Sequence, residues 1–218
     1  METFARWDLQ INDGKTEWLS FEIGREEWKS SRQLGSLLGD DEDLVRRKAL
    51  ASSAYRSLYC MFLRRRHISL ERRLKLYNAF VLPVLLYNCS TWALTQSQAT
   101  SLSAFHRRQL RSVLGIRWPD IISNVELYRR TRQADVMSMV NQARLRLLGH
   151  CLRMDTESPP QRALDLYCNT SLKGRRGRPK TTLGSSLRHD VGLTASTLRT
   201  LREEAADRHG WRTVIHRL

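Results

Sequence analysis

Residues 95–115 read TQSQATSLSAFHRRQLRSVLG, and this stretch carries every signal of a complete α-helix. Thr95 and Gln98 stand at the spacing of a capping box, in which each side chain bonds the backbone N–H of the other residue. Gly115 is the residue type that most readily adopts the left-handed conformation found at helix ends. Between these signals, apolar residues recur at helical spacing, at Leu102, Phe105, Leu110 and Val113. The stretch therefore predicts a helix with one buried face.

The helical spacing continues on both sides of this stretch. An acidic run at Asp40–Asp43 suits the N-terminus of a helix. It precedes apolar residues on one helical face, at Ala51, Ala54, Tyr55, Leu58 and Phe62. Ser69 is predicted to cap a further helix that Pro83 breaks. Downstream, Ser123–Glu126 has the form of a second capping box, and a long helix is expected over about 135–153.

The two ends of the chain follow other patterns. Residues 8–19 alternate in polarity around a turn at 12–14 and predict a β-hairpin, and a second short β element is expected around 32–38. Residues 155–183 are rich in Pro, Gly and Arg, and 170–183 are interpreted as an exposed basic linker. A last helical unit is expected at about 194–217, with a small core of Leu198, Leu201, Ala205, Trp211 and Val214. The expected fold class is therefore mainly α, with four divisions at 1–38, 39–154, 155–183 and 184–218.

The charge of the chain is large and unevenly placed. The 218 residues include 37 Lys and Arg against 22 Asp and Glu, which gives a net charge of +15. The first 45 residues carry −6, so the remaining 173 carry +21. Such a field favours a polyanionic partner, and guanidinium groups grip phosphates bidentately. The alternative is a solvated surface that reflects composition alone.

Other partners and sites find less support in the sequence. No apolar run approaches the ~20 residues that span a bilayer, and no signal segment opens the chain. Cys60 and Cys89 lie in apolar runs and are interpreted as core residues. His150, beside Cys151, lacks a partner at i+4 and is interpreted as a helix-face residue rather than a metal ligand. We therefore expect a nuclear or cytoplasmic protein that is not secreted, with no membrane partner, metal or cofactor.

Short motifs recur along the chain in a consistent order. Residues 9–12 and 15–17, Leu-Gln-Ile-Asn and Lys-Thr-Glu, are similar to G-L-x-I-N-x-x-K-T, with Asp8 in place of the usual Gly. Residues 33–36, Gln-Leu-Gly-Ser, are similar to Y-L-G-S, with Gln33 in place of Tyr. Residues 81–92, VLPVLLYNCSTW, are similar to V-L-P-x-L-L-Y-G-x-E-T-W.

The later motifs continue the same order. Residues 110–118, LRSVLGIRW, are similar to L-R-x-I-L-G-I-x-W, and residues 144–154, RLRLLGHCLRM, to R-x-R-W-L-G-H-x-x-R-M. Residues 177–180, GRPK, come next in the chain and are similar to a G-R-P-x motif. Together these motifs resemble the C-terminal part of reverse transcriptases from non-LTR (LINE-type) retrotransposons, and they span nearly all of the chain.

The resemblance implies a truncated palm remnant at 1–38, a helical thumb-like bundle at 39–154 and a small C-terminal helical unit. It implies that this region holds the duplex of RNA template and DNA primer. Nucleotide addition needs carboxylates that hold two Mg²⁺ ions, and the strands that bear them in the family do not occur here. We therefore expect no polymerase activity from this chain, and Mg²⁺ only in an intact parent enzyme. Asp40-Asp41 is interpreted as a helix-start charge cluster, not as the catalytic pair.

Several residues are candidates for binding nucleic acid. Lys15 matches a lysine that could act as general acid in an intact enzyme only. Gln33, Leu34 and Gly35 match the primer grip, although Gly35 alone is equally well a turn residue. The remaining candidates are basic clusters at Arg64, Arg65 and Arg66, at Arg107, Arg108 and Arg111, at Arg129, Arg130 and Arg132, and at Arg175, Arg176, Arg178 and Lys180.

Two further features have alternative interpretations. The sequence Arg176-Gly177-Arg178 has the core of an AT-hook, which reads the minor groove of A·T-rich DNA, but it also suits a flexible basic linker. Trp92 and Trp118 could stack on bases, but the sequence favours both as residues that seal the helical core.

The predicted function is that of a nucleic-acid-binding C-terminal fragment of such a polymerase, with an RNA–DNA hybrid or duplex DNA as partner. The alternatives are a standalone DNA- or RNA-binding protein derived from the element, and a nonfunctional open reading frame. Its oligomeric state stays open.

Overall fold

The computed structural model describes residues 10, 12, 14, 27–169 and 181–217. Most of the hairpin predicted at 8–19, with Lys15 and Trp18, and the linker candidates Arg175, Arg176, Arg178 and Lys180 lie outside the described residues. Within the described part the chain is mainly helical, with a single two-stranded antiparallel hairpin, so the predicted fold class is confirmed.

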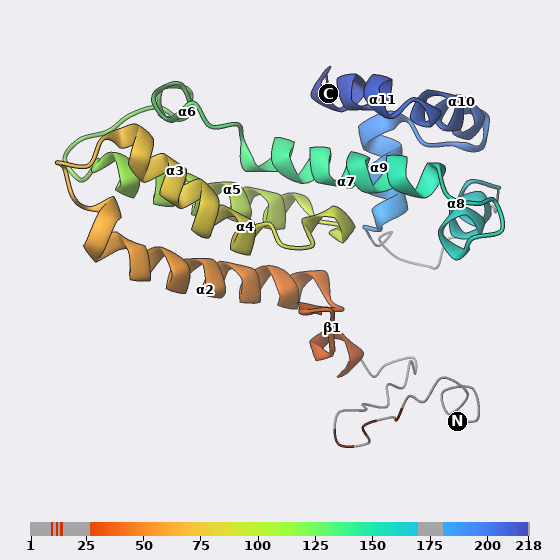
Figure 1. Cartoon of the computed structure of the whole chain (residues 1–218), viewed down its shortest axis with the longest axis horizontal. Coiled ribbons are helices and arrows are strands. Elements are labelled where there is room, and N and C mark those ends of the chain that lie inside the picture. The colour runs from red at the N-terminus through yellow and green to blue at the C-terminus, as the bar shows by residue number, and fades with distance from the viewer. Residues whose placement is uncertain (1–9, 11, 13, 15–26, 170–180, 218) are drawn as a thin grey trace.

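The first half of the described chain forms a layered bundle (Figure 1). A 3₁₀ turn, η2 (Glu27–Ser30), leads into the hairpin of β1 (Arg32–Gln33) and β2 (Ser36–Leu37). The bundle elements that follow are α2 (Asp40–Leu58), the π-helical turn η3 (Tyr59–Leu63), α3 (Leu70–Phe80), α4 (Leu82–Leu85), η4 (Cys89–Thr91), α5 (Gln96–Leu114) and α6 (Asn124–Thr131).

The long helix α7 (Val136–Leu152) leads from the bundle to the C-terminal unit. Around its second half lie α8 (Pro159–Asn169), α9 (Leu183–Val191), α10 (Ala195–Ala206) and α11 (Arg208–Arg217) (Figure 1). None of the described helices is long and apolar enough to cross a membrane.

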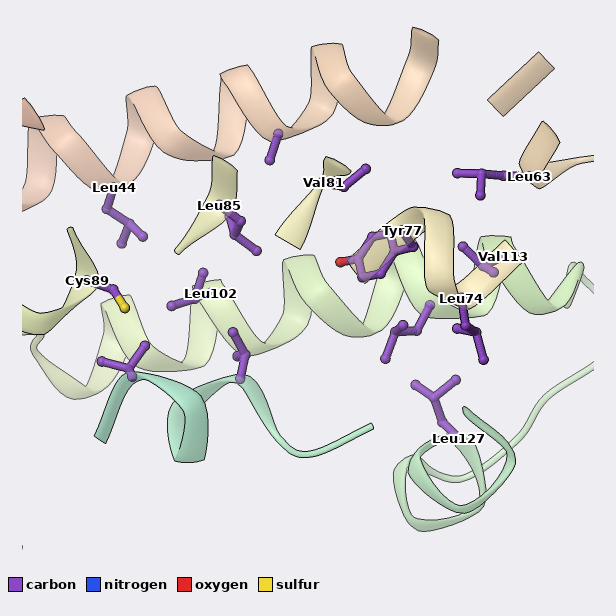
Figure 2. Close-up of a cluster of buried hydrophobic side chains, with 14 of the residues drawn as sticks. Leu44, Leu63, Leu74, Tyr77, Val81, Leu85, Cys89, Leu102, Val113 and Leu127 are labelled. Carbon is purple, nitrogen blue, oxygen red and sulfur yellow. The ribbon is translucent and has the colours of Figure 1, made fainter. Parts of the chain in front are cut away.

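The bundle core lies between α2, α3–α4 and α5, with α6 and the start of α7 closing it (Figure 2). Tyr77 is fully buried near its centre, and burial raises the pKa of its phenol. The protonated hydroxyl therefore donates to Gln109 Oε1 at 2.9 Å, which satisfies both buried polar groups. Leu44 of α2, Leu102 of α5 and Leu127 of α6 converge on the same core from three sides (Figure 2).

A second core holds the C-terminal unit together. It combines Leu145, Leu148 and Leu152 of α7 with Leu198, Leu201 and Trp211 of the following helices. Gly149 lies under Trp211, where a β-carbon would overlap the indole ring. The indole Nε1 donates to the backbone oxygen of Leu145 at 3.0 Å. The glycine of the LGH motif thus permits a close approach between α11 and the backbone of α7.

Most predicted helix ends are confirmed. Thr95 and Gln98 form the capping box, and Gly115 ends α5 at φ +78°. Ser69 caps α3 through the Arg72 N–H. Ser123 likewise caps α6 through the Glu126 N–H, but the expected reciprocal bond is not formed. The Glu126 carboxylate instead accepts from Arg129 and Arg130, since charge-assisted bonds compete successfully for it.

The structure differs from the sequence prediction in several segments. Residues 159–169, placed in the predicted linker, form α8, which packs Leu164 and Tyr167 against the second core. The C-terminal unit also includes α9 and half of α7, so its core begins before the predicted boundary at 184. Pro83 does not only break a helix, because it lies in the first turn of α4, where its missing N–H is harmless. Cys60, expected in the core, is exposed, whereas Cys89 is buried.

Candidate nucleic-acid interface

Four arginines surround a hollow at the end of the bundle where α2, α3 and α5 meet η3. This bundle-end hollow has a volume of about 570 Å³ and is lined by Arg64, Arg66, Arg73 and Arg117. Tyr59 and Ser112 add hydroxyl groups, and no carboxylate is among the described residues that line it. A concave site with four guanidinium groups and no acid is suited to bind an anion.

Two of the four arginines are fixed by hydrogen bonds. Arg73 donates through Nη1 to the backbone oxygen of Val113 at 2.5 Å and to that of Leu63 at 3.4 Å. These bonds tie α3 to the ends of α5 and η3. Arg117 donates through Nη2 to the Tyr59 hydroxyl at 2.6 Å. The walls of the hollow are therefore held by side chains that come from distant parts of the sequence.

The other two arginines are not engaged in this way. Arg64 and Arg66 are exposed, and neither forms a side-chain hydrogen bond or an ion pair with any residue that the structure describes. Both follow η3, a π-helical turn in which the Arg64 N–H donates to the Tyr59 oxygen at 2.9 Å. Their guanidinium groups are free to meet a ligand without first breaking an internal bond.

An exposed aromatic residue directly follows one of the arginines that line the hollow. Trp118 follows Arg117 in the loop between α5 and α6, and its exposed fraction is 87%. The prediction that Trp118 seals the core is therefore wrong, whereas Trp92, at 1%, is a core residue as predicted. The difference arises because Trp118 comes after the Gly115 cap, where the chain has already left the packed face of α5. Arg111 of α5 donates to Asn124 Oδ1 at the start of α6 at 2.7 Å, and this bond links the two ends of the loop.

The structure separates the predicted basic clusters. Arg64 and Arg66 line the bundle-end hollow, but their neighbour Arg65 does not. Arg107 and Arg108 lie on α5 and do not line it, and Arg111 donates to Asn124 after the loop. Arg73 and Arg117 were not singled out from the sequence, since only the packing of α3 against α5 brings them to Arg64. The one local signal was the Arg117-Trp118 pair just after a helix end.

The residues matched to a primer grip form the tip of the β1–β2 hairpin. Leu34 and Gly35 have positive φ values of 48° and 84°, as in a tight two-residue turn. Both of their carbonyl groups are bound internally. Tyr87 donates to the Leu34 oxygen at 2.7 Å, and Arg46 and Arg47 donate to the Gly35 oxygen. The Leu34 side chain is left 89% exposed.

Gln33, the remaining residue of this motif, lines a different hollow. With Thr181 and Leu183 it borders a space of about 370 Å³ next to the N-terminus of α2. The last residues of the predicted basic linker, 181–183, therefore lie beside the hairpin.

The acidic run at the start of α2 serves packing. Asp43 is buried, and its carboxylate accepts from the Leu37 N–H at 3.0 Å and from Trp92 Nε1 at 3.1 Å, next to Arg47. Asp40 accepts from the Ala93 N–H at 3.1 Å, and burial raises the pKa of its carboxyl. Among the residues that the structure describes, no three His, Cys, Asp or Glu side chains gather as metal ligands would.

No known protein family, curated protein sequence or solved structure matches this chain. The resemblance drawn from the sequence motifs therefore stays a prediction.

Proposed function

We propose that this chain binds nucleic acid, as the part of a LINE-type reverse transcriptase that holds a duplex without performing nucleotide addition. The observation that carries the proposal is the bundle-end hollow, in which four arginines meet without a carboxylate. The resemblance of the sequence motifs is the basis for the family in this proposal. The net charge of +15 attracts a polyanion such as nucleic acid over long range.

The geometry supports a definite division of roles. Arg64 and Arg66, which have no described partner, contact phosphate oxygens. Arg73 and Arg117 contribute charge while they hold the walls of the hollow through Val113 and Tyr59. Trp118 offers an exposed aromatic face to an unpaired base, which stacks on it without regard to sequence. The bound strand thus passes the hollow with its backbone on the arginines.

The test is a salt titration by fluorescence anisotropy with an RNA–DNA hybrid, an A·T-rich duplex and a G·C-rich duplex. We expect log K to fall against log salt with a slope on the order of −4 to −7, as for about five to eight phosphate contacts. The double variant Arg64→Gln/Arg66→Gln is expected to flatten this slope by about two units. A slope near zero for the unchanged chain would contradict nucleic-acid binding as its function.

A matched control separates the hollow from net charge. Arg162→Gln/Arg199→Gln also removes two positive charges, from exposed positions on α8 and α10 outside the bundle-end hollow. We expect it to change the slope by much less than one unit. Equal effects of the two double variants would assign binding to the general field of the protein, as a standalone basic protein without a defined site would show.

The predicted linker and the predicted lack of catalysis each need their own measurement. Replacing Arg175, Arg176, Arg178 and Lys180 by Ala is expected to flatten the slope by about two to four units if the linker follows the phosphate backbone. It also removes any preference for A·T-rich DNA if the AT-hook interpretation is right. The purified chain is expected to incorporate no nucleotides with Mg²⁺ or Mn²⁺, and incorporation that co-purifies with the protein would overturn this.

A further inference from the structure

A second basic hollow is lined by residues of α7, its C-cap and α11. The C-terminal end of α7 and α11 lie toward the other end of the molecule from the connection between α2 and α3 (Figure 1). This α7–α11 hollow has a volume of about 660 Å³. The basic side chains that line it are Arg146, His150, Arg153, Arg208, Arg212 and His216. None of them is a candidate for binding nucleic acid in the sequence analysis, where Arg146, His150 and Arg153 occur only within the motif at 144–154.

Helical spacing explains how so many basic groups converge. Arg146 and His150 on α7 and Arg153 at its C-cap stand at i, i+4 and i+7, so they follow one face of that helix. On α11, Arg208, Arg212 and His216 repeat at i, i+4 and i+8. Two basic stripes on neighbouring helices therefore face one space.

The floor of the hollow is well fixed. Trp211 and Ile215, each about 2% exposed, lie at its base and belong to the second core. The Trp211 indole is held by its bond to the Leu145 oxygen and by its contact with Gly149. Arg153 donates through Nη1 to the Ala205 oxygen at 3.0 Å, which links α7 to the end of α10. The relative position of the two stripes is therefore determined by packing, and no flexible loop is needed to bring them together.

The charges in this hollow are not neutralised within the described structure. No carboxylate lines it, and Arg146, Arg208 and Arg212 form no ion pair or side-chain hydrogen bond with the described residues. Three other arginines in this part of the molecule do form ion pairs, Arg144 with Asp190, Arg202 with Asp165 and Arg199 with Glu203. The nearby Asp207 is also engaged, because it accepts from the His209 and Gly210 N–H groups.

We propose that the α7–α11 hollow is a binding site for phosphate groups, distinct from the bundle-end hollow. Several guanidinium forks that approach from two helices match the multiple acceptor oxygens of phosphate. The volume falls in the range of small-ligand sites, so it accommodates more than one phosphate group. Two sources offer this chemistry, the backbone of a nucleic acid and a soluble pyrophosphate-bearing compound. The proposal does not require the bundle-end hollow to bind anything.

The experiment titrates the full chain separately with inorganic pyrophosphate and with a short duplex. Binding is followed through the NMR signal of the Trp211 indole N–H, which lies at the floor of the hollow. We expect pyrophosphate to shift this signal in a saturable way. Arg208→Gln/Arg212→Gln should weaken pyrophosphate binding about tenfold or more, since charge-assisted bonds are lost. The matched Arg162→Gln/Arg199→Gln should change it less than about twofold.

Each arm has a result that decides the question. If the duplex also loses affinity in Arg208→Gln/Arg212→Gln, the source is the nucleic-acid backbone, and if only pyrophosphate does, the source is a soluble compound. Arg64→Gln/Arg66→Gln should leave pyrophosphate binding here unchanged, so this proposal and the proposed function fail separately. A Trp211 signal unmoved by both ligands, or equal losses in the matched control, would overturn the proposal. Arg146→Gln/Arg208→Gln, which alters one residue of each wall, repeats the test should the first variant not fold.

Discussion

The two ends of α2 use charged side chains in opposite ways. At its N-terminus, Asp43 is buried and bound to Leu37, Trp92 and Arg47, so the charges join the hairpin to the bundle. Beyond its C-terminus, Arg64 and Arg66 project into a hollow without a described partner. Both ends are runs of like charge in the sequence. A run of like charges stabilises the fold where residues distant in the sequence supply hydrogen-bond or ion-pair partners. Where they supply none, the charges stay available to a ligand.

The largest expected effect comes from a substitution that removes the buried carboxylate at the N-terminus of α2. Asp43→Ala leaves Arg47 as a buried charge without its carboxylate and removes the acceptor of the Leu37 and Trp92 N–H groups. We expect a loss of about 3–5 kcal/mol in the free energy of unfolding, measured by urea denaturation. Asp41→Ala is the matched control from the same acidic run, and because Asp41 is exposed it should change stability by less than about 1 kcal/mol. Similar effects of the two variants would show that the Asp43 network is not what stabilises this end.

A buried titratable group without hydrogen-bond partners should make the stability of the fold depend on pH, which the exposed arginines should not. His106 lies fully buried in α5, and neither ring nitrogen has a hydrogen-bond partner among the described residues. Burial lowers the pKa of His106 to about 4, so the folded protein favours the neutral ring. The unfolded chain, with an ordinary pKa near 6.5, takes up a proton first as the pH falls. Stability is therefore lost as pH drops from about 6.5 toward 4.

The free energy of unfolding at pH 7 and at pH 5 measures the contribution of His106. From the pKa values we expect His106 to account for a loss on the order of 2 kcal/mol in the free energy of unfolding. In His106→Leu the corresponding part of the pH dependence should disappear. Denaturation of both proteins at the two pH values measures the difference, and identical pH dependence would mean that His106 does not titrate in this range.

The smallest expected effect concerns the exposed Trp118, which follows the bundle-end hollow's Arg117 in the sequence. Trp118→Ala should leave the stability of the fold within about 0.5 kcal/mol, because the side chain is 87% exposed. It should weaken binding of single-stranded oligonucleotides by about 1 kcal/mol, as for the loss of one stacked base. Trp118→Phe retains an aromatic face and should retain most of the affinity. An affinity that is insensitive to both substitutions would remove base stacking from the account.

Local signals predicted the helices well, because a helix end depends on a few neighbouring residues. Thr95, Gln98 and Gly115 determine α5, and Ser69 determines the start of α3. The Pro, Gly and Arg content of 155–183 predicts a linker there, yet residues 159–169 form α8 because Leu164 and Tyr167 pack against the second core. Propensity could not reveal that partner.

The candidate sites depended even more on tertiary packing. Arg64 and Arg66 were found as a charge run, but Arg73 and Arg117 join them only through the contacts of α3 with α5 and η3. The α7–α11 hollow combines stripes more than fifty residues apart in the sequence. Each stripe has helical spacing, so a search for basic residues at i, i+4 and i+7 or i+8 could have identified both. Their convergence could not have been predicted without the fold.

The most direct test of the central claim maps where a bound strand lies. An oligonucleotide with 5-iodouridine in an unpaired stretch next to an RNA–DNA hybrid can be cross-linked to the full chain, and the modified peptides identified by mass spectrometry. The account predicts cross-links at Tyr59, which lines the bundle-end hollow, and at Trp118, which follows the lining residue Arg117. These cross-links should be lost in Arg64→Gln/Arg66→Gln and retained in Arg162→Gln/Arg199→Gln. Cross-links that avoid residues 59–66 and 112–118 in the unchanged protein would contradict it.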